Sequence, residues 1–330
     1  MPEILFLHKG KHAASTRYRA LQYFDCLREA GWHPQEMKVS GSVANYREAI
    51  QTVCKADVVV VLKKPFTPIF RWFLRREAQR LVFDFDDAIY VRDSGVNSVG
   101  RLKQFQKMLV QCDDVWAGNE ELLSSAAEFA IQKCLIQTTL PHTKYQLGPN
   151  KPESSIDLVW IGGSASRPWL ESILPVLEKA ALQLPGLRLK IVADFTLQTK
   201  SLEVIAVPWS EDTEAQALVD AHIGIAPLPD SAFTRGKCGL KTLQYMAAGL
   251  PVIASPTSVQ SDLVETGMNG FLADSENDWL DALHRLAADA RLRESMGQAG
   301  RLHCARHYSV EAGCQKILNR LDALMAKSGI

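Results

Sequence analysis

The stretch that decides the fold is Ile223–Ala254, which reads IGIAPLPDSAFTRGKCGLKTLQYMAAGLPVIA. It begins with a short apolar strand, Ile223–Ala226, and passes through a polar loop into a helical pattern from Gly239 to Ala248. Gly249 is typical of a residue that ends a helix, and a second apolar strand, Pro251–Ala254, follows it. Strand, helix and strand in this order predict a parallel βαβ unit.

The same alternation extends in both directions from this stretch. Further apolar strands are predicted at Ile4–His8, Val58–Leu62, Leu81–Phe83, Asp114–Ala117, Leu135–Ile136, Leu158–Ile161, Leu189–Val192 and Leu202–Val207. Gln146–Ser155, with Gly148, Pro149 and Pro152, is the best linker candidate. We therefore predict an α/β protein with two Rossmann-like domains facing a cleft. The N-terminal domain is 1–150, the C-terminal domain is 151–307, and a helix in 308–330 packs back on the first domain.

Composition excludes several classes of protein. Of the 330 residues, 47% are hydrophobic and 22% are charged, which is ordinary globular composition and excludes a largely disordered chain. Lys+Arg and Asp+Glu are both 37, so the net charge of zero argues against a nucleic-acid partner. No apolar run approaches the ~20 residues of a membrane span, and the N-terminus does not resemble a signal peptide. Seven scattered cysteines, with no CxxC pair, favour reduced thiols and a cytoplasmic location.

Two glycine-containing segments could hold a phosphate. Gly239 opens the predicted helix of the deciding stretch, where free N–H groups and the helix dipole favour an anion. Lys241 lies in its first turn, Gln244 lies three residues further on the same face, and Lys237 precedes the helix. The alternative is a surface loop with solvated lysines. Gly162-Gly163-Ser164 follows a strand and could cradle the same anion with Arg167, although a plain turn would read the same way.

Three carboxylates close a strand in the N-terminal half, at Asp84, Asp86 and Asp87. One of them could orient or deprotonate an acceptor hydroxyl. Two alternatives remain: a divalent metal site holding a diphosphate, or purely structural roles in which Asp87 caps a turn and Asp84 pairs with a nearby arginine.

Basic residues gather at two places in the first half. Ser15, Thr16, Arg17 and Arg19 follow the first strand, where Arg17 could grip a phosphate, or Ser15 or Thr16 could cap a helix while the arginines stay solvated. Residues 63–80 carry six basic side chains interleaved with aromatic ones, which is typical of a helix on an anionic membrane surface. The competing interpretation is core packing with a solvated arginine face.

The deciding stretch, together with Gly267–Leu272, Arg293–Gly297 and Tyr308-Ser309, resembles the donor-site signature of retaining glycosyltransferases of the GT-B architecture. It is most similar to the large bacterial family of mannosyl-, glucosyl- and rhamnosyltransferases of envelope polysaccharides. Ser15–Arg19 and Asp84–Ala88 extend the resemblance over nearly the whole chain. The family commonly carries two glutamates separated by seven residues. Gly236 and Gln244 stand in their places here, and Gln244 can still hydrogen-bond a ribose hydroxyl.

The resemblance implies site residues. At the position of Asp86, relatives often carry a histidine facing the sugar. Catalytic roles are implied for Asp86, Asp87 and Lys241, and an acceptor-side role for Ser15, Thr16, Arg17, Arg19 and Asp84. Donor binding is implied for Gly162, Gly163, Ser164, Arg167, Lys237, Cys238, Gly239, Leu240, Lys241 and Gln244.

These observations together predict a hexosyltransferase-type glycosyltransferase of polysaccharide biosynthesis in the cell envelope. Its donor would be a UDP- or GDP-linked sugar, its acceptor a glycan or lipid-linked hydroxyl, and no cofactor or metal would be needed. It would lie in the cytoplasm, or peripherally on the inner face of the plasma membrane through residues 63–80. A GT-B-like protein that only binds a nucleotide sugar or a partner, and a nucleotide-sugar epimerase, are the alternatives. A nicotinamide dehydrogenase is disfavoured because no first-strand loop reads GxGxxG.

Overall fold

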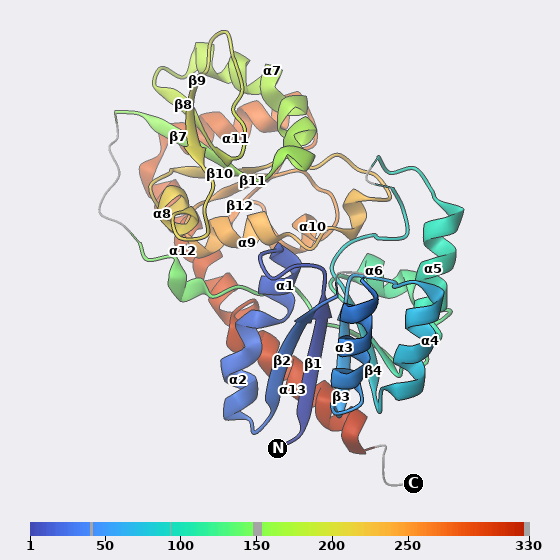
Figure 1. Cartoon of the computed structure of the whole chain (residues 1–330). Helices are drawn as coiled ribbons and strands as arrows, with labels where there is room; N and C mark the ends of the chain where they lie inside the picture. Colours follow the sequence, from blue (N-terminus) through green and yellow to red (C-terminus); the bar gives the residue numbers. More distant parts are fainter. Residues whose placement is uncertain (40–41, 93, 148–153, 327–330) are drawn as a thin grey trace. The chain divides into compact units, whose positions relative to one another are not determined.

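The computed structural model describes residues 1–39, 42–92, 94–147 and 154–326 (Figure 1). The chain divides into two compact units. The first comprises Met1–Thr139, Ser231–Cys238 and Val310–Ile330, and the second comprises Leu140–Asp230 and Gly239–Ser309. Most of the predicted linker, 148–153, lies outside the described residues.

The first unit is built on one parallel sheet in the order β2-β1-β3-β4-β5-β6. Its strands are β1 Glu3–His8, β2 His33–Lys38, β3 Val58–Leu62, β4 Leu81–Phe85, β5 Asp114–Ala117 and β6 Lys133–Leu135. The helices are α1 Ala14–Arg19, η1 Leu21–Tyr23, α2 Phe24–Glu29, α3 Val43–Val53, α4 Pro68–Glu77, α5 Val99–Leu109, α6 Glu120–Ser125, η4 Thr234–Gly236 and α13 Val310–Ala326. The strand order reverses between β1 and β3, and α/β sheets bind ligands at the carboxyl ends of strands beside such a reversal.

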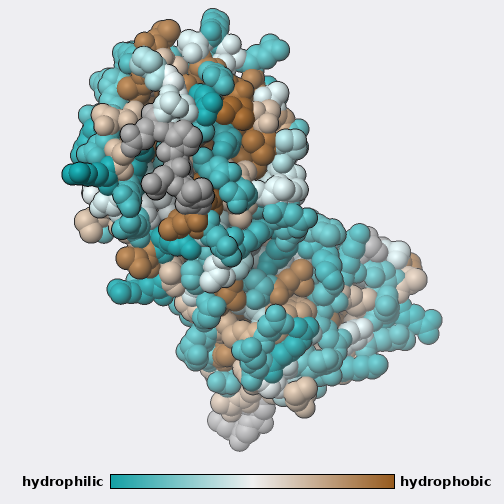
Figure 2. All heavy atoms as spheres, turned by 90° about the vertical axis from the view of Figure 1, so that its left-hand side faces the viewer, coloured by the Kyte–Doolittle hydropathy of each residue, from teal (hydrophilic) through white to brown (hydrophobic). Residues whose placement is uncertain are grey.

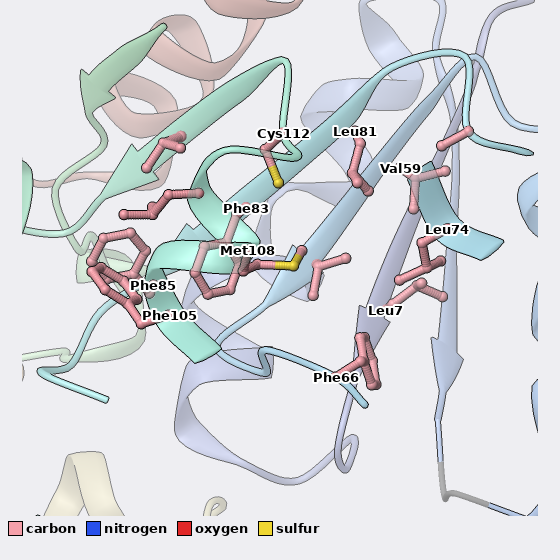
Figure 3. Close-up of a cluster of buried hydrophobic side chains, with 14 of the residues drawn as sticks. Leu7, Val59, Phe66, Leu74, Leu81, Phe83, Phe85, Phe105, Met108 and Cys112 are labelled. Atoms are coloured by element: carbon pink, nitrogen blue, oxygen red, sulfur yellow. The ribbon is translucent and has the colours of Figure 1, made fainter. Parts of the chain in front are cut away.

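Both faces of this sheet are buried, which explains why its strands read as unbroken apolar runs. Alternate residues of one strand enter different clusters: Leu7 joins the cluster beneath α3, α4 and α5 (Figure 3), whereas Phe6 joins the cluster beneath α2 and α13. In the first of these clusters Phe83, Phe85 and Phe105 pack ring against ring.

Helix α13 belongs to the first unit although it ends the chain. Its residues Cys314, Ile317, Leu321 and Leu324 are buried in the cluster that contains Phe6. Cys26 of α2 and Cys314 form a disulfide across 288 residues of sequence. The prediction that all cysteines are reduced thiols is therefore wrong for this pair, because nothing in the spacing shows that the two helices are neighbours. Cys54, Cys112, Cys134, Cys238 and Cys304 are free thiols.

The second unit is also a single parallel sheet, in the order β12-β11-β10-β7-β8-β9. Its strands are β7 Ile156–Ile161, β8 Leu187–Ala193, β9 Glu203–Pro208, β10 Ile223–Ala226, β11 Val252–Ala254 and β12 Gly270–Leu272. The helices are η2 His142–Lys144, η3 Ser164–Ser166, α7 Arg167–Gln183, α8 Glu214–Val219, α9 Leu240–Ala247, α10 Gln260–Leu263, α11 Glu276–Ala288 and α12 Ala290–His307. Here the order reverses between β7 and β10, so the loops after these two strands adjoin the reversal.

The deciding stretch folds as predicted, into β10, α9 and β11. Gly249 ends the helix with a φ of +68°, a left-handed conformation that glycine adopts without strain. Helix α9 packs so closely on β10 that a Cβ at Gly224 would lie 2.4 Å from the ring of Tyr245. The predicted α/β class with two Rossmann-like sheets is confirmed.

The surface shown in Figure 2 is mostly hydrophilic, with hydrophobic residues in scattered groups, as on an ordinary globular protein. Within the described ranges, the helices are all too short or too polar to cross a membrane.

Candidate functional site

Lys241 places a positive charge at the carboxyl edge of the second sheet. It lies in the first turn of α9, after Gly239, whose φ of +68° lets the chain turn sharply into the helix. Its ammonium lies 4.1 Å from the ring centroid of Trp160, the buried tryptophan near the end of β7, and 3.0 Å from Oγ of Ser166. The ring of Trp169 lies 5.6 Å away. An ammonium held over an indole face keeps its charge in a fixed place.

The loop after β7 lies against this ammonium. A Cβ added at Gly162 would lie 2.7 Å from Nζ of Lys241, so the absence of a side chain there lets the backbone approach the cation. The structure thus brings together three of the predicted donor-side positions, Gly162, Gly239 and Lys241, at the reversal between β7 and β10.

Other predicted donor residues of this unit have different partners. The backbone N–H and hydroxyl of Ser164 donate to the carboxylate of Asp194, at 3.0 and 2.8 Å, rather than standing open for a phosphate. Arg167 pairs with Glu171 at 2.8 Å and stacks on Phe195. Ser164 thus has an acceptor within the protein, whereas Glu171 engages only Nε of Arg167.

Gln244 is buried and donates to the hydroxyl of Tyr145 at 3.1 Å. Gly163 lies in the loop after β7, and Leu240 is the first residue of α9, directly before Lys241. Among the residues that the sequence did not single out, Trp160, Ser166 and Asp194 contact predicted site residues. Two of them could have been predicted from the sequence, because Trp160 lies near the end of one predicted strand and Asp194 lies just after the next.

The segment containing Gly236, Lys237 and Cys238 belongs to the first unit, not to the unit of Lys241. Asn119, at the end of β5, holds it by donating from Nδ2 to the carbonyls of Arg235 and Lys237, both at 2.9 Å. The predicted role of Lys237 and Cys238 in donor binding stays a prediction. They pack with the residues that follow β4.

Gly236 lies close against Ala88 of the same unit. An added Cβ would lie 2.7 Å from the backbone nitrogen of Ala88 and 2.6 Å from its methyl group. A carboxylate side chain at this position would therefore require the backbone around Ala88 to shift.

Asp86 and Asp87 form a cluster of charges with two lysines at the carboxyl edge of the first sheet. Lys63 lies 2.7 Å from Asp87 and 3.4 Å from Asp86, and Lys237 lies 2.9 Å from Asp87. Burial would raise the pKa of Asp86, but the attraction of Lys63, followed by that of Arg19 and Lys237, holds it below its usual range. Asp86 is thus an anion that can accept a hydrogen bond from a hydroxyl.

Cys238 adds a neutral group to the edge of this cluster. Its thiol lies 3.4 Å from the carbonyl of Asp86, and burial raises the pKa of the thiol. A neutral thiol at this position contributes packing and a weak hydrogen bond, and it supplies no charge to a donor phosphate.

Asp84 and Arg19 form a buried ion pair with each other. The two side chains are almost completely buried, and Nε of Arg19 donates to Asp84 at 3.0 Å while its other nitrogens donate to Asp84 and to the carbonyl of Ile136. Burial lowers the pKa of Arg19, but the Asp84 carboxylate outweighs that effect and raises it overall. The alternative in which Asp84 pairs with a nearby arginine is confirmed, and the acceptor-side role of these two residues stays a prediction.

The β1–α1 loop places the remaining acceptor-side residues. Helix α1 begins at Ala14 with Ala13 as its N-cap and no capping side chain, so the alternative that Ser15 or Thr16 caps it is wrong. Thr16 is buried and donates to the carbonyl of Gly10 at 2.8 Å, Ser15 is half-buried, and Arg17 stacks on the ring of Tyr18.

Part of the chain resembles known glycosyl transferases in sequence. Residues 155–289 match the family model described as glycosyl transferases group 1. That segment contains Gly162, Gly239 and Lys241. The D-inositol 3-phosphate glycosyltransferase of Corynebacterium jeikeium is 36% identical over 81 residues, which are 24% of this chain and 19% of that protein. The matches to such curated relatives thus span about a fifth of their length.

Solved structures resemble the whole chain. Sucrose-phosphate synthase of Thermosynechococcus elongatus aligns with a TM-score of 0.77 and 16% identity, covering 99% of this chain and 100% of the other. HepE of Anabaena, solved with UDP and glucose, aligns with a TM-score of 0.71 and 14% identity over 98% of this chain and 100% of the other. At these identities the likeness shows a shared fold, that of GT-B glycosyltransferase structures.

Proposed function

We propose that the chain is a glycosyltransferase that moves a sugar from a nucleoside-diphosphate sugar to a hydroxyl of a glycan or lipid-linked acceptor. The observation that carries this proposal is Lys241, held against Trp160 and Gly162 at the strand reversal of the segment that matches group 1 glycosyl transferases. UDP-sugars are the donors we favour, because HepE, whose fold this chain shares, was solved with UDP-glucose.

The physical demand of this reaction is to stabilise the diphosphate as it departs and the sugar becomes oxocarbenium-like. Lys241 and the N–H groups at the start of α9 would face the developing negative charge. The ring of Trp160 holds the ammonium of Lys241 in place, so the charge needs no reorganisation during the reaction. On the acceptor side, the ionised Asp86 would accept a hydrogen bond from the attacking hydroxyl and orient it.

Retention of configuration and independence from metal are further parts of the proposal. Lysine side chains already pair with Asp86 and Asp87, and Arg19 pairs with Asp84, so these carboxylates are engaged by cations of the protein itself. Lys241 supplies a positive charge for the diphosphate in the second unit.

A panel of UDP-, GDP-, dTDP- and ADP-sugars tests the function. We expect one nucleotide to raise the melting temperature by several degrees, since a ligand at 100 times its Kd stabilises the folded state by about 2.7 kcal/mol. The same sugar nucleotide should release free nucleoside diphosphate, at a rate that EDTA leaves unchanged. No shift with any nucleotide at millimolar concentration would contradict the proposal. A shift without release would indicate a binding protein, and a product that keeps its diphosphate would indicate an epimerase.

A membrane surface as a partner is a separate proposal, carried by α4. Ile69, Trp72 and Phe73 are 73%, 52% and 38% exposed on this helix. The helix presents less positive charge to solvent than the sequence suggested, because Arg71 is buried against Gln104 and Arg75 is paired with Asp113. The apolar side chains, rather than the arginines, would therefore carry most of the attraction.

Sedimentation with phospholipid vesicles tests this surface. We expect the protein to bind vesicles, and we expect a variant with Ile69→Ser and Trp72→Ser to lose most of that binding, because both side chains are exposed and apolar. Anionic lipid should strengthen binding only modestly. Replacing the exposed Leu302 of α12 with serine is the matched control and should change nothing. Binding that survives the loss of both α4 side chains would exclude this helix.

A further inference from the structure

Lys63 has a backbone conformation that lysine rarely adopts. It follows β3 directly and has a φ of +56°, in the left-handed region. Ser258 is the other non-glycine residue with positive φ within the described ranges. A side chain with a Cβ is disfavoured there, so the position costs free energy that glycine would not cost. Such strain gathers at functional positions, where the surrounding structure enforces it.

The conformation directs the lysine across the end of the neighbouring strand. Its backbone N–H donates to the carbonyl of Asp84 at 2.7 Å, while its ammonium reaches Asp87 at 2.7 Å and Asp86 at 3.4 Å. One residue thus fixes the end of β4 through the main chain and orients the two carboxylates that follow it.

Asp86 is surrounded by charged and titratable groups from every element packed around it. They are Arg19 of α1, Lys63 after β3, Asp84 of β4, the adjacent Asp87, and Lys237 and Cys238 after η4. The side chain of Asp86 is 18% exposed, so the effective dielectric constant around it is low. Arg19 is already committed to Asp84, and Lys237 is nearest to Asp87. Lys63 contacts both carboxylates.

We infer that Lys63 is a positioning residue of the transfer reaction, which holds the Asp86 and Asp87 carboxylates as oriented anions at the carboxyl edge of the first sheet. The inference rests on the proposed function and names a residue that the family resemblance did not single out. Lys63 acts through the two carboxylates and needs no contact with either substrate.

Lys63→Gly removes the ammonium without adding backbone strain, because glycine adopts the φ of +56° freely. We expect Lys63→Gly to be at least as stable to urea as Lys63→Ala. We also expect it to lower turnover of the sugar nucleotide identified by the panel about 10- to 100-fold, since the carboxylates lose their orientation. Lys63→Arg should recover part of that loss.

The pH profile provides a readout that a purely structural role would not move. The pKa of Asp86 lies below its usual range with Lys63 present, so without Lys63 it rises. Activity that needs ionised Asp86 is lost as the pH falls through that pKa. The acid limb of the Lys63→Gly profile should therefore lie at higher pH than that of the wild type, and Lys63→Arg should restore it.

Lys55→Gly is the matched control, because Lys55 is an exposed lysine in the turn between α3 and β3, and it should leave turnover and the acid limb unchanged. An active wild-type protein whose Lys63→Gly variant keeps full turnover and the same acid limb would overturn the role of Lys63 alone. A wild-type protein that turns over no sugar nucleotide would overturn the proposed function, and the role of Lys63 with it.

Discussion

Replacing Lys241 with alanine should lower the release of nucleoside diphosphate about 100- to 1,000-fold at saturating donor, while the protein stays folded. Loss of one preorganised group that stabilises developing charge typically has an effect of this size. Lys241 fits that role because Trp160 and Ser166 fix its ammonium in place before any ligand arrives. The effect should fall mainly on kcat, since the charge on the diphosphate grows as the sugar bond breaks.

The control for this variant is Lys179→Ala. Lys179 lies on α7 of the same unit, is exposed, and pairs with Glu276 at the surface, where an ion pair contributes little. Its removal should leave turnover unchanged. Circular dichroism and the urea midpoint would show whether Lys241→Ala remains folded. Full activity in a folded Lys241→Ala variant would remove this residue from the mechanism and with it the main support for the donor site.

Arg19→Leu should destabilise the first unit by about 3–5 kcal/mol, because it leaves the Asp84 carboxylate buried without its cation. The substitution also removes the donor to the carbonyl of Ile136. The measurement is urea unfolding of the full-length chain, followed by the fluorescence of its tryptophans. A second variant that combines Arg19→Leu with Asp84→Leu should recover part of the loss, since it no longer buries an unpaired charge.

A surface ion pair on a neighbouring helix gives the comparison. Arg28 pairs with Asp25 at 2.7 Å on α2, and both side chains are largely exposed. Arg28→Ala should therefore change the free energy of unfolding by less than about 1 kcal/mol. Equal losses for Arg19→Leu and Arg28→Ala would show that burial of the Arg19–Asp84 pair has no special weight in this fold.

The sequence alone predicts the two parallel sheets because each central strand is covered on both faces. Val58–Leu62 illustrates the reason: all five residues are buried, so no polar residue interrupts the run. The edge strands β2 and β12 were not predicted. Strand β2 is only partly buried, and β12 spans just three residues, so neither carries a clear apolar pattern.

Part of the candidate site in the second unit could also be predicted from the sequence. Glycine at the start of a helix and lysine in its first turn are neighbours in sequence, so their meeting at Gly239 and Lys241 depends on short-range geometry alone. Trp160, by contrast, stands 81 positions before Lys241, and only the order of β7 and β10 in the sheet brings its ring beneath the ammonium.

The sequence by itself determined the α/β class, the glycine-to-helix turn at Gly239 with Lys241 in its first turn, and the presence of carboxylates after β4, because each follows from residues within a few positions of one another. The tertiary structure decided how these parts are used. Asn119 and Ala88 draw Gly236–Cys238 into the first unit, Arg19 neutralises Asp84, and Cys26 meets Cys314. Each of these contacts joins residues far apart in the chain, and the order of strands in the sheets, which no local pattern encodes, sets which of them become neighbours.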